Sequence, residues 1–321
     1  MTTVDLSVEE QAGGLAGRLF ESLIAMAELE TVYLGVKLGL YEALSTPATA
    51  GELAARTGLH PRYAREWLEQ QAVAGLLTVS DVDAADRVFT LPPGHSEALT
   101  NPASPFAVAS IALLAGGAGQ VMGAVLDVYR HGGGLSFGGY GDDVRAGQGG
   151  FNRAAFSYQL CSEWLPAIPS VHDRLASGPA RVLDVACGVG WSSIALAAEF
   201  PALLVDGIDS DEASIADARR NAADAGLTDR VRFEVQDAVG GSSARYDAVF
   251  IFEALHDMAH PVPALASLRE VLAPGGSVVV MDERVAESFT APGDELERAF
   301  YAFSVRSEEH TSELQSRTLI S

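Results

Sequence analysis

The stretch of sequence that decides the fold runs from residue 182 to 190 and reads VLDVACGVG. A short apolar run ends in a turn of small residues, and a segment with helical composition begins directly after it near Trp191. Glycines at such a turn let a ligand approach the backbone without obstruction by a Cβ atom. The stretch therefore predicts a strand, a ligand-binding turn and a helix.

The chain that follows this turn alternates between apolar runs and helical segments. Strands are expected at 181–185, 203–208, 231–235, 248–252 and 277–281, with helices at 192–199, 212–225 and 262–272. Strands that alternate with helices indicate a parallel sheet with right-handed crossovers. The fold class is thus α/β, with a Rossmann-like sheet of about five parallel strands.

An acid ends each of the first three strands: Asp184, Asp209 and Asp237. The carboxyl ends of parallel strands meet at one edge of the sheet, so these side chains converge on one crevice. A dinucleotide is one candidate ligand, but Ser193 stands at the third glycine position of its fingerprint, and Asp184 would repel a pyrophosphate. S-adenosylmethionine, which has a cationic amine and no phosphate, fits better. Asp184 can meet its ammonium directly or through water, Asp209 its ribose and Asp237 its adenine amino group.

These segments resemble the motifs of class I S-adenosylmethionine-dependent methyltransferases over about residues 178–285. The resemblance is carried by LDVACGVG (183–190), GID (207–209), QDA (236–238) and LAPGG (272–276), with Ala186 where the family often has glycine. It implies S-adenosylmethionine as cofactor and a set of contacts at the strand ends: Asp184, Ala186, Cys187, Gly188, Gly190, Asp209, Ser210, Asp237, Ala238 and Phe252. The family usually has seven strands, so the sheet of this chain is expected to be C-terminally truncated.

A histidine follows the fourth strand in the sequence FEALHDM (252–258). Plant-type O-methyltransferases have a His-Asp-Trp at this place, and the histidine supplies the base; here Met258 replaces the tryptophan. If the methyl acceptor is a hydroxyl, a histidine is a suitable general base at neutral pH. We therefore take His256 as the candidate catalytic residue. A histidine that merely packs, or that contacts the ligand without proton transfer, is the alternative.

The N-terminal segment has the element order of a winged helix: helices over 8–45, 50–56 and 60–74, then two short strands near 76–79 and 87–91. It resembles the dimerisation module of small-molecule O-methyltransferases through LGLYEAL (38–44), ELA (52–54) and LEQQAVAGLL (68–77). That resemblance implies a homodimer. A winged helix can also bind DNA. A transcription regulator with a ligand-sensing α/β domain is accordingly the alternative function, and a dinucleotide oxidoreductase is a third.

The predicted domains are a winged-helix dimerisation domain over 1–105, a glycine-rich helical connector over 106–175 and a truncated cofactor-binding methyltransferase domain over 176–305. The last segment, 306–321, lacks the Ala, Gly and Val that fill the preceding chain. It resembles a translated sequencing adapter and is predicted to be non-native.

The composition of the chain limits the classes of molecule that it is expected to bind. A net charge of −22 argues against a broad nucleic-acid footprint and against docking on an anionic membrane. Two cysteines suit a reducing compartment, and no secretory signal is recognised at the N-terminus, so a cytoplasmic location is expected. The charge-free stretch 103–126 is expected to be a buried helix rather than a membrane span. The histidines show no metal-ligand spacing, and no metal is predicted. The expected reaction partner is a small-molecule methyl acceptor.

Overall fold

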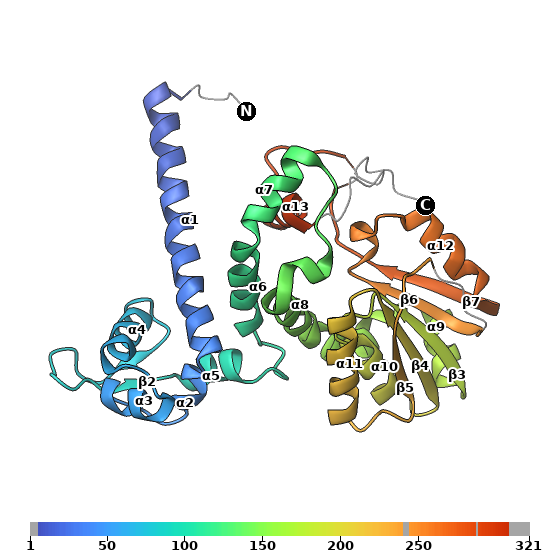
Figure 1. The fold of residues 1–321 in the computed structure, drawn as a ribbon, viewed down its shortest axis with the longest axis horizontal. Helices are drawn as coiled ribbons and strands as arrows, with labels where there is room; N and C mark the ends of the chain where they lie inside the picture. Colours follow the sequence, from blue (N-terminus) through green and yellow to red (C-terminus); the bar gives the residue numbers. More distant parts are fainter. Residues whose placement is uncertain (1–5, 240–243, 287, 308–321) are drawn as a thin grey trace. The chain divides into compact units, whose positions relative to one another are not determined.

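A computed structural model describes residues 6–239, 244–286 and 288–307, excluding the side chains of residues 306 and 307. The chain divides into two compact units, residues 1–116 and 117–321 (Figure 1). Each unit is described by itself.

Unit 1 is helical with a small wing. Its helices are α1 (Val8–Lys37), α2 (Leu40–Ala43), α3 (Ala50–Thr57), α4 (Pro61–Val73) and α5 (Pro93–Thr100). The helix ends follow the local sequence: Ser7 and Thr49 form capping boxes with Glu10 and Glu52, and Pro61 stands in the first turn of α4. The predicted order of helices and hairpin is confirmed.

The wing of unit 1 is a two-stranded antiparallel hairpin of β1 (Thr78–Val79) and β2 (Phe89–Thr90), shorter than predicted. Phe89 also bridges to Ala48 and is buried. It belongs to a core formed by α2, α3, α4, α5 and the wing: Leu40, Tyr41, Leu44, Ala48, Leu53, Trp67, Leu68, Leu77, Phe89, Leu91 and Leu99. By contrast, α1 buries only Gly35 along its whole length.

Helix α6 (Ala109–Gln120) spans the boundary between the units, and a series of helices follows it. They are α7 (Met122–His131), the 3₁₀ turn η1 (Phe137–Tyr140), α8 (Gly141–Ala155), the π-helix η2 (Phe156–Trp164) and α9 (Pro169–Ala176). Part of the glycine-rich composition expected in this connector lies within a helix, because Gly147, Gly149 and Gly150 belong to α8. Among the described residues, no single helix meets the length and hydropathy needed to cross a membrane; α6 and α7 do so only as a pair bent by 54°.

The sheet of unit 2 has five parallel strands in the order β5-β4-β3-β6-β7. They are β3 (Ala180–Val185), β4 (Leu203–Asp209), β5 (Val231–Val235), β6 (Tyr246–Phe252) and β7 (Leu272–Met281). The chain moves outward from β3 to β5 and then returns to the other side of β3 with β6. That reversal beside β3 is the topological switch point, where open α/β sheets bind ligands.

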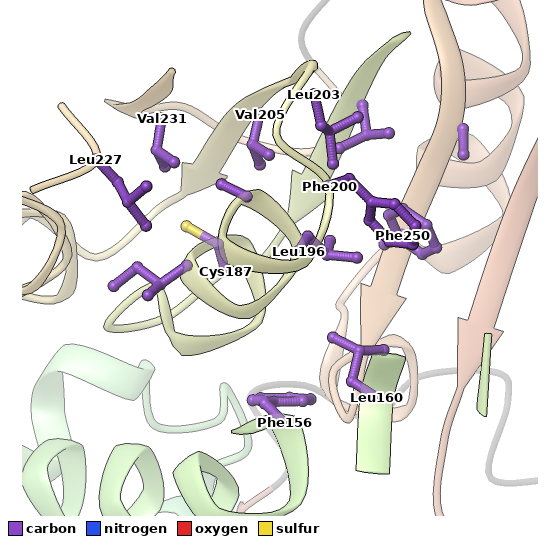
Figure 2. Packing of buried hydrophobic residues seen from close by; sticks show 14 of the residues in the cluster. Phe156, Leu160, Cys187, Leu196, Phe200, Leu203, Val205, Leu227, Val231 and Phe250 are labelled. Atoms are coloured by element: carbon purple, nitrogen blue, oxygen red, sulfur yellow. The ribbon is translucent and has the colours of Figure 1, made fainter. Parts of the chain in front are cut away.

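Helices cover both faces of this sheet (Figure 1). One face packs on η2, α9, α10 (Trp191–Glu199) and α11 (Glu212–Asp224), and Figure 2 shows Leu196 of α10 among Phe200, Leu203 and Phe250. The other face packs on α12 (Pro261–Glu270) through Leu268 and its neighbours. The Rossmann-like parallel sheet is confirmed. Its strands begin and end within two residues of the prediction, except that β7 begins five residues earlier.

The last described element is α13 (Glu295–Ser307). The Tyr129 hydroxyl donates a hydrogen bond of 3.0 Å to the carbonyl of Val305, so α13 contacts α7. The predicted non-native segment 306–321 lies outside the described residues except for the backbone of 306 and 307.

Candidate active site at the switch point

The turn between β3 and α10 is built from residues in the left-handed region. Ala186 has φ 54°, Gly188 φ 52° and Gly190 φ 85°. The two glycines differ in their surroundings: a Cβ atom on Gly190 would lie 2.6 Å from the Phe233 ring, whereas nothing lies within 4 Å of that position on Gly188. Gly190 is therefore needed for packing, and the open backbone at Gly188 is the place where a ligand can approach.

Asp184 is buried at the end of β3, with 1% of its surface exposed. Its Oδ2 atom accepts hydrogen bonds of 2.6 Å from the hydroxyls of Ser192 and Ser193 in the first turn of α10. Burial raises the pKa of the carboxyl from 3.8 to about 6, against the opposing effect of the two serines. The Oδ2 atom is occupied by the two serines of α10. The predicted contact between Asp184 and the cofactor ammonium is therefore favoured through a water molecule over a direct contact.

Asp209, at the end of β4, joins two loops. Its Oδ2 atom accepts a 2.8 Å hydrogen bond from the amide of Gly188, and its Oδ1 atom accepts one of 2.9 Å from the amide of Asp211. Each carboxylate oxygen can accept a second hydrogen bond. Ser210, next in the chain, is exposed. The carboxylate of Asp209 is thus fixed against the glycine turn.

The remaining predicted contacts fall into two groups. Asp237 is exposed beyond β5, where its carboxylate accepts a 2.8 Å hydrogen bond from the amide of Val239, and Ala238 is half-buried beside it. Cys187 and Phe252 are instead buried, and Phe252 packs on Phe156 and Phe250 with ring centroids 5.5 and 5.4 Å away. These two residues contribute to the core under the site, so only their backbone or ring edge can face a ligand.

His256 lies in the 3₁₀ turn η3 (Leu255–Asp257) after β6, at the same edge of the sheet. Its Nδ1 contacts the Oδ1 of Asp282, which follows β7, and its backbone amide donates a 3.1 Å hydrogen bond to the Oδ2 of Asp282. Its Nε2 lies 3.5 Å from Asp257 and 3.9 Å from Glu283. Both ring nitrogens of His256 therefore face acidic side chains.

The backbone is strained on both sides of the switch point. Ala186 follows β3 and Glu253 follows the adjacent β6, and among the described residues only these two non-glycine residues have positive φ, at 54° and 52°. A side chain in this region costs roughly 1–2 kcal/mol, and such strain clusters at functional sites. The strain therefore marks the same crevice as the glycine turn.

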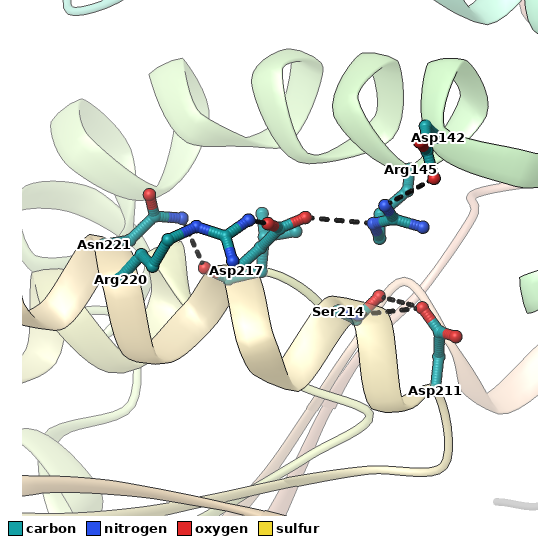
Figure 3. A network of polar contacts seen from close by, with 8 residues as sticks. Asp142, Arg145, Asp211, Ser214, Asp217, Arg220 and Asn221 are labelled. Atoms are coloured by element: carbon teal, nitrogen blue, oxygen red, sulfur yellow. Dashed lines mark hydrogen bonds and ion pairs between the residues drawn. The ribbon is translucent and has the colours of Figure 1, made fainter.

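Helix α8 covers the glycine turn. The sequence predicted the turn but not this cover. The Cβ position of Gly149 lies 2.4 Å from a methyl group of Val189, so only glycine allows this approach. The carbonyl of Val189 also accepts a 2.9 Å hydrogen bond from Asn221 of α11. Figure 3 shows the polar link between the two helices, where Arg145 of α8 pairs with Asp217 of α11 at 2.9 Å.

A cation lies at the start of α10. The guanidinium of Arg153, at the end of α8, stacks 4.0 Å from the centroid of the Trp191 ring, and burial lowers its pKa. No sequence signal pointed to Arg153, because its partner is distant in the chain. The glycine turn is thus flanked by carboxylates on the strand side and by one guanidinium on the helix side.

A cavity of about 300 Å³ lies elsewhere, against the sheet face that packs on α12. Arg181, Asp206, Arg232 and Glu234 line it, and Arg181 pairs with Asp206 at 2.6 Å. None of the predicted cofactor contacts lines it. Within the described ranges, no three His, Cys, Asp or Glu side chains are grouped to hold a metal ion.

Two family models match the chain. Residues 182–276 match a methyltransferase domain, and residues 26–101 match an Rv2258c-like winged helix-turn-helix domain. Among curated proteins, the demethylmenaquinone methyltransferase of Thermus thermophilus is 37% identical over 110 residues, which are 34% of this chain and 49% of that protein. The chain spans about half or less of the length of the curated relatives that it matches.

Solved structures of similar fold extend over nearly the whole chain. The mitomycin 7-O-methyltransferase has a TM-score of 0.64 and 22% identity, covering 94% of this chain and 89% of its own. Human N-acetylserotonin methyltransferase, in complex with S-adenosylmethionine, has a TM-score of 0.66 and 15% identity, covering 97% and 90%. The solved structures thus share the fold of this chain, in which residues 26–101 match a winged helix-turn-helix domain and residues 182–276 a methyltransferase domain.

Proposed function

We propose that the chain is an S-adenosylmethionine-dependent methyltransferase that transfers a methyl group to a hydroxyl of a small molecule. The observation that carries this proposal is the open backbone at Gly188 beside the fixed carboxylate of Asp209. The matched domain and the O-methyltransferases among its relatives support the activity.

The residues at the strand ends suit the parts of this cofactor. Asp209 places a carboxylate, which accepts hydrogen bonds from hydroxyls, at the end of β4 for the ribose. Asp237 with Ala238 lies beyond β5, where an adenine amino group can be bound. Asp184 acts on the ammonium through the turn, and Arg153 suits the carboxylate of the methionine part. The wall around the cofactor is formed by Ala186, Cys187, Gly190, Ser210 and Phe252. The bound cofactor would supply an electrophilic methyl carbon, and the protein aligns the acceptor against it and excludes water.

We place the side chain of His256 against the reacting hydroxyl, where it is either the general base or a ligand contact that takes no proton. It follows β6, the strand next to β3, so its turn and the glycine turn share one edge of the sheet. Burial lowers the pKa of His256, and its neighbours Asp257 and Asp282 raise that pKa.

The test of the proposed function is calorimetry with S-adenosylhomocysteine. We expect binding by the full chain and a loss of about tenfold or more in Asp209→Asn, because hydrogen bonds to a charged group contribute roughly 1.5–3 kcal/mol. Asp229→Asn, an exposed acid between α11 and β5, is the matched control and should bind as the parent does. No binding by the parent chain, or equal binding by Asp209→Asn, would reject the cofactor site.

We further propose that α1 forms a homodimer with a second copy of the chain. Six large apolar side chains along this helix are about half exposed within the chain: Leu15, Leu19, Phe20, Leu23, Ile24 and Met26. An exposed apolar row of this size is typical of a protein interface. Light scattering should show twice the mass of the chain.

The free thiols of Cys161 and Cys187 support a cytoplasmic location.

The match to a winged helix-turn-helix model favours one alternative, a regulator that binds DNA through α4. The cations available there are largely paired, since Arg62 lies 3.4 Å from Glu66 and Arg87 lies 2.6 Å from Glu69. Binding of duplex DNA that weakens steeply between two salt concentrations would support the regulator. If the chain binds no duplex DNA, the methyltransferase is the function that remains.

A further inference from the structure

The imidazole of His256 is held in one orientation by Asp282. Three groups contact this carboxylate: the Nδ1 of His256, the backbone amide of His256 at 3.1 Å and the backbone amide of Glu283 at 3.0 Å. Because the ring and its own main chain bind the same carboxylate, the ring cannot rotate without losing contacts. The Nε2 atom is therefore presented in a fixed direction.

The surroundings of Nε2 are carboxylates. Asp257 Oδ2 lies 3.5 Å away and Glu283 Oε1 lies 3.9 Å away, and Glu253 is close enough for its pKa to be affected by His256. Ionised carboxylates are acceptors only, so an unprotonated Nε2 would direct its lone pair at other lone pairs. The Nε2 atom therefore carries a proton. The Nδ1 atom faces the Oδ1 of Asp282 and carries a proton for the same reason, so His256 is an imidazolium.

The titration behaviour agrees with this geometry. Burial alone would lower the pKa of His256, but the hydrogen bonds and charges of Asp257 and Asp282 outweigh burial and raise that pKa to about 11. An imidazolium has no lone pair with which to take a proton. At neutral pH, the group that takes a proton in this cluster must therefore be a carboxylate.

Glu283 is the carboxylate that is suited to this task. Asp282 is already occupied by three donors, whereas the described residues donate no hydrogen bond to the carboxylate of Glu283. Burial, the largest influence, and nearby acids raise the pKa of Glu283 to about 7, although the charge of His256 opposes them. A base is most effective when its pKa lies near the working pH.

We propose that Glu283 takes the proton of the acceptor hydroxyl, while His256 stays positively charged and holds the oxygen as it becomes anionic. The inference rests on the proposed function. The O–H bond breaks and its proton passes to Glu283. An electron pair of the oxygen forms the bond to the methyl carbon, and the carbon–sulfur bond breaks with its pair left on sulfur. The proton on Glu283 then leaves to solvent.

The first test follows His256 directly and needs no acceptor. Nuclear magnetic resonance of the full chain with isotope-labelled histidine gives the protonation state of each ring, and His256→Gln identifies the signal. We expect His256 to remain protonated at pH 8 and to titrate lower in Asp282→Asn. A midpoint near the ordinary value of about 6.5 would overturn the inference, while calorimetry with S-adenosylhomocysteine reports separately on the proposed function.

The second test uses two probe acceptors at pH 8: phenol, which is protonated, and 4-nitrophenol, which is already ionised. Glu283→Gln should lower methylation of phenol by roughly 100-fold, the lower limit for losing a general base, and methylation of 4-nitrophenol by a few-fold only. The exposed Glu270→Gln on α12 is the matched control and should affect neither. Equal losses on both probes in Glu283→Gln, or a phenol-selective loss in His256→Gln alone, would return the base role to His256.

Discussion

Replacing Asp184 with asparagine should stabilise the fold at neutral pH while weakening cofactor binding. The carboxyl is buried, and its pKa is raised from 3.8 to about 6 by that burial. The unfolded chain therefore loses this proton at a lower pH than the folded chain. Stability from this group is greatest below pH 3.8 and falls as the pH rises through 6.

The size of the effect follows from the two pKa values. A tenfold difference in proton affinity corresponds to about 1.4 kcal/mol, so ionising Asp184 costs about 3 kcal/mol in the folded chain above pH 6. Asparagine carries no charge and keeps one oxygen for Ser192 and Ser193, but these hydrogen bonds become weaker by about 1 kcal/mol. The net gain is about 1–2 kcal/mol, or an increase of about 2–8 °C in Tm for a domain of this size.

The assay is thermal unfolding of the parent, Asp184→Asn and the control Asp229→Asn at several pH values between 4 and 7.5. The difference between Asp184→Asn and the parent should be largest at pH 7.5 and shrink toward pH 4. If Asp184→Asn unfolds at a lower temperature than the parent at every pH, the serine hydrogen bonds outweigh burial and the reasoning is refuted. Calorimetry on the same samples should show weaker S-adenosylhomocysteine binding in Asp184→Asn.

Three further predictions concern the backbone, the cover over the turn and the dimer. Ala186→Gly should relieve the left-handed strain and raise the free energy of unfolding by about 0.5–1 kcal/mol after the entropy cost of glycine, as measured by chemical denaturation; a decrease would mean that the turn is not strained. Gly149→Ala should destabilise unit 2 by about 1–3 kcal/mol and weaken S-adenosylhomocysteine binding, whereas Gly119→Ala, at an open position, should not. The double change Leu19→Glu and Leu23→Glu should halve the mass seen by light scattering without lowering cofactor affinity, and an unchanged mass would exclude α1 as the interface.

The strands of unit 2 were predictable because each apolar run is short and bounded by turn residues. The run at 231–235 and strand β5 coincide, and β3, β4 and β6 differ from prediction by one or two residues at an end. Strand β7 begins five residues earlier than expected, at Leu272. Its early start pairs Leu272 with Tyr246 and leaves an irregularity before Ser277, which a local apolar pattern does not report.

The site was only partly predictable, since local patterns say nothing about partners that are distant in the chain. Asp282, after β7, contacts His256, after β6, and no sequence spacing predicts that the two residues meet. Likewise, the glycine-rich composition of the connector does not reveal that Gly149 is a helical residue whose missing side chain makes room for Val189. The contacts assigned to individual cofactor atoms remain predictions.

The carboxylate of Asp209 has a consequence for the motion of the site. It holds the amide of Gly188 in one loop and the amide of Asp211 in the next, so neither loop can open without breaking a hydrogen bond to the same side chain. The two segments should exchange their amide hydrogens as one cooperative unit. A ligand that binds the side chain of Asp209 would slow exchange in both loops at once, including amides that it never touches.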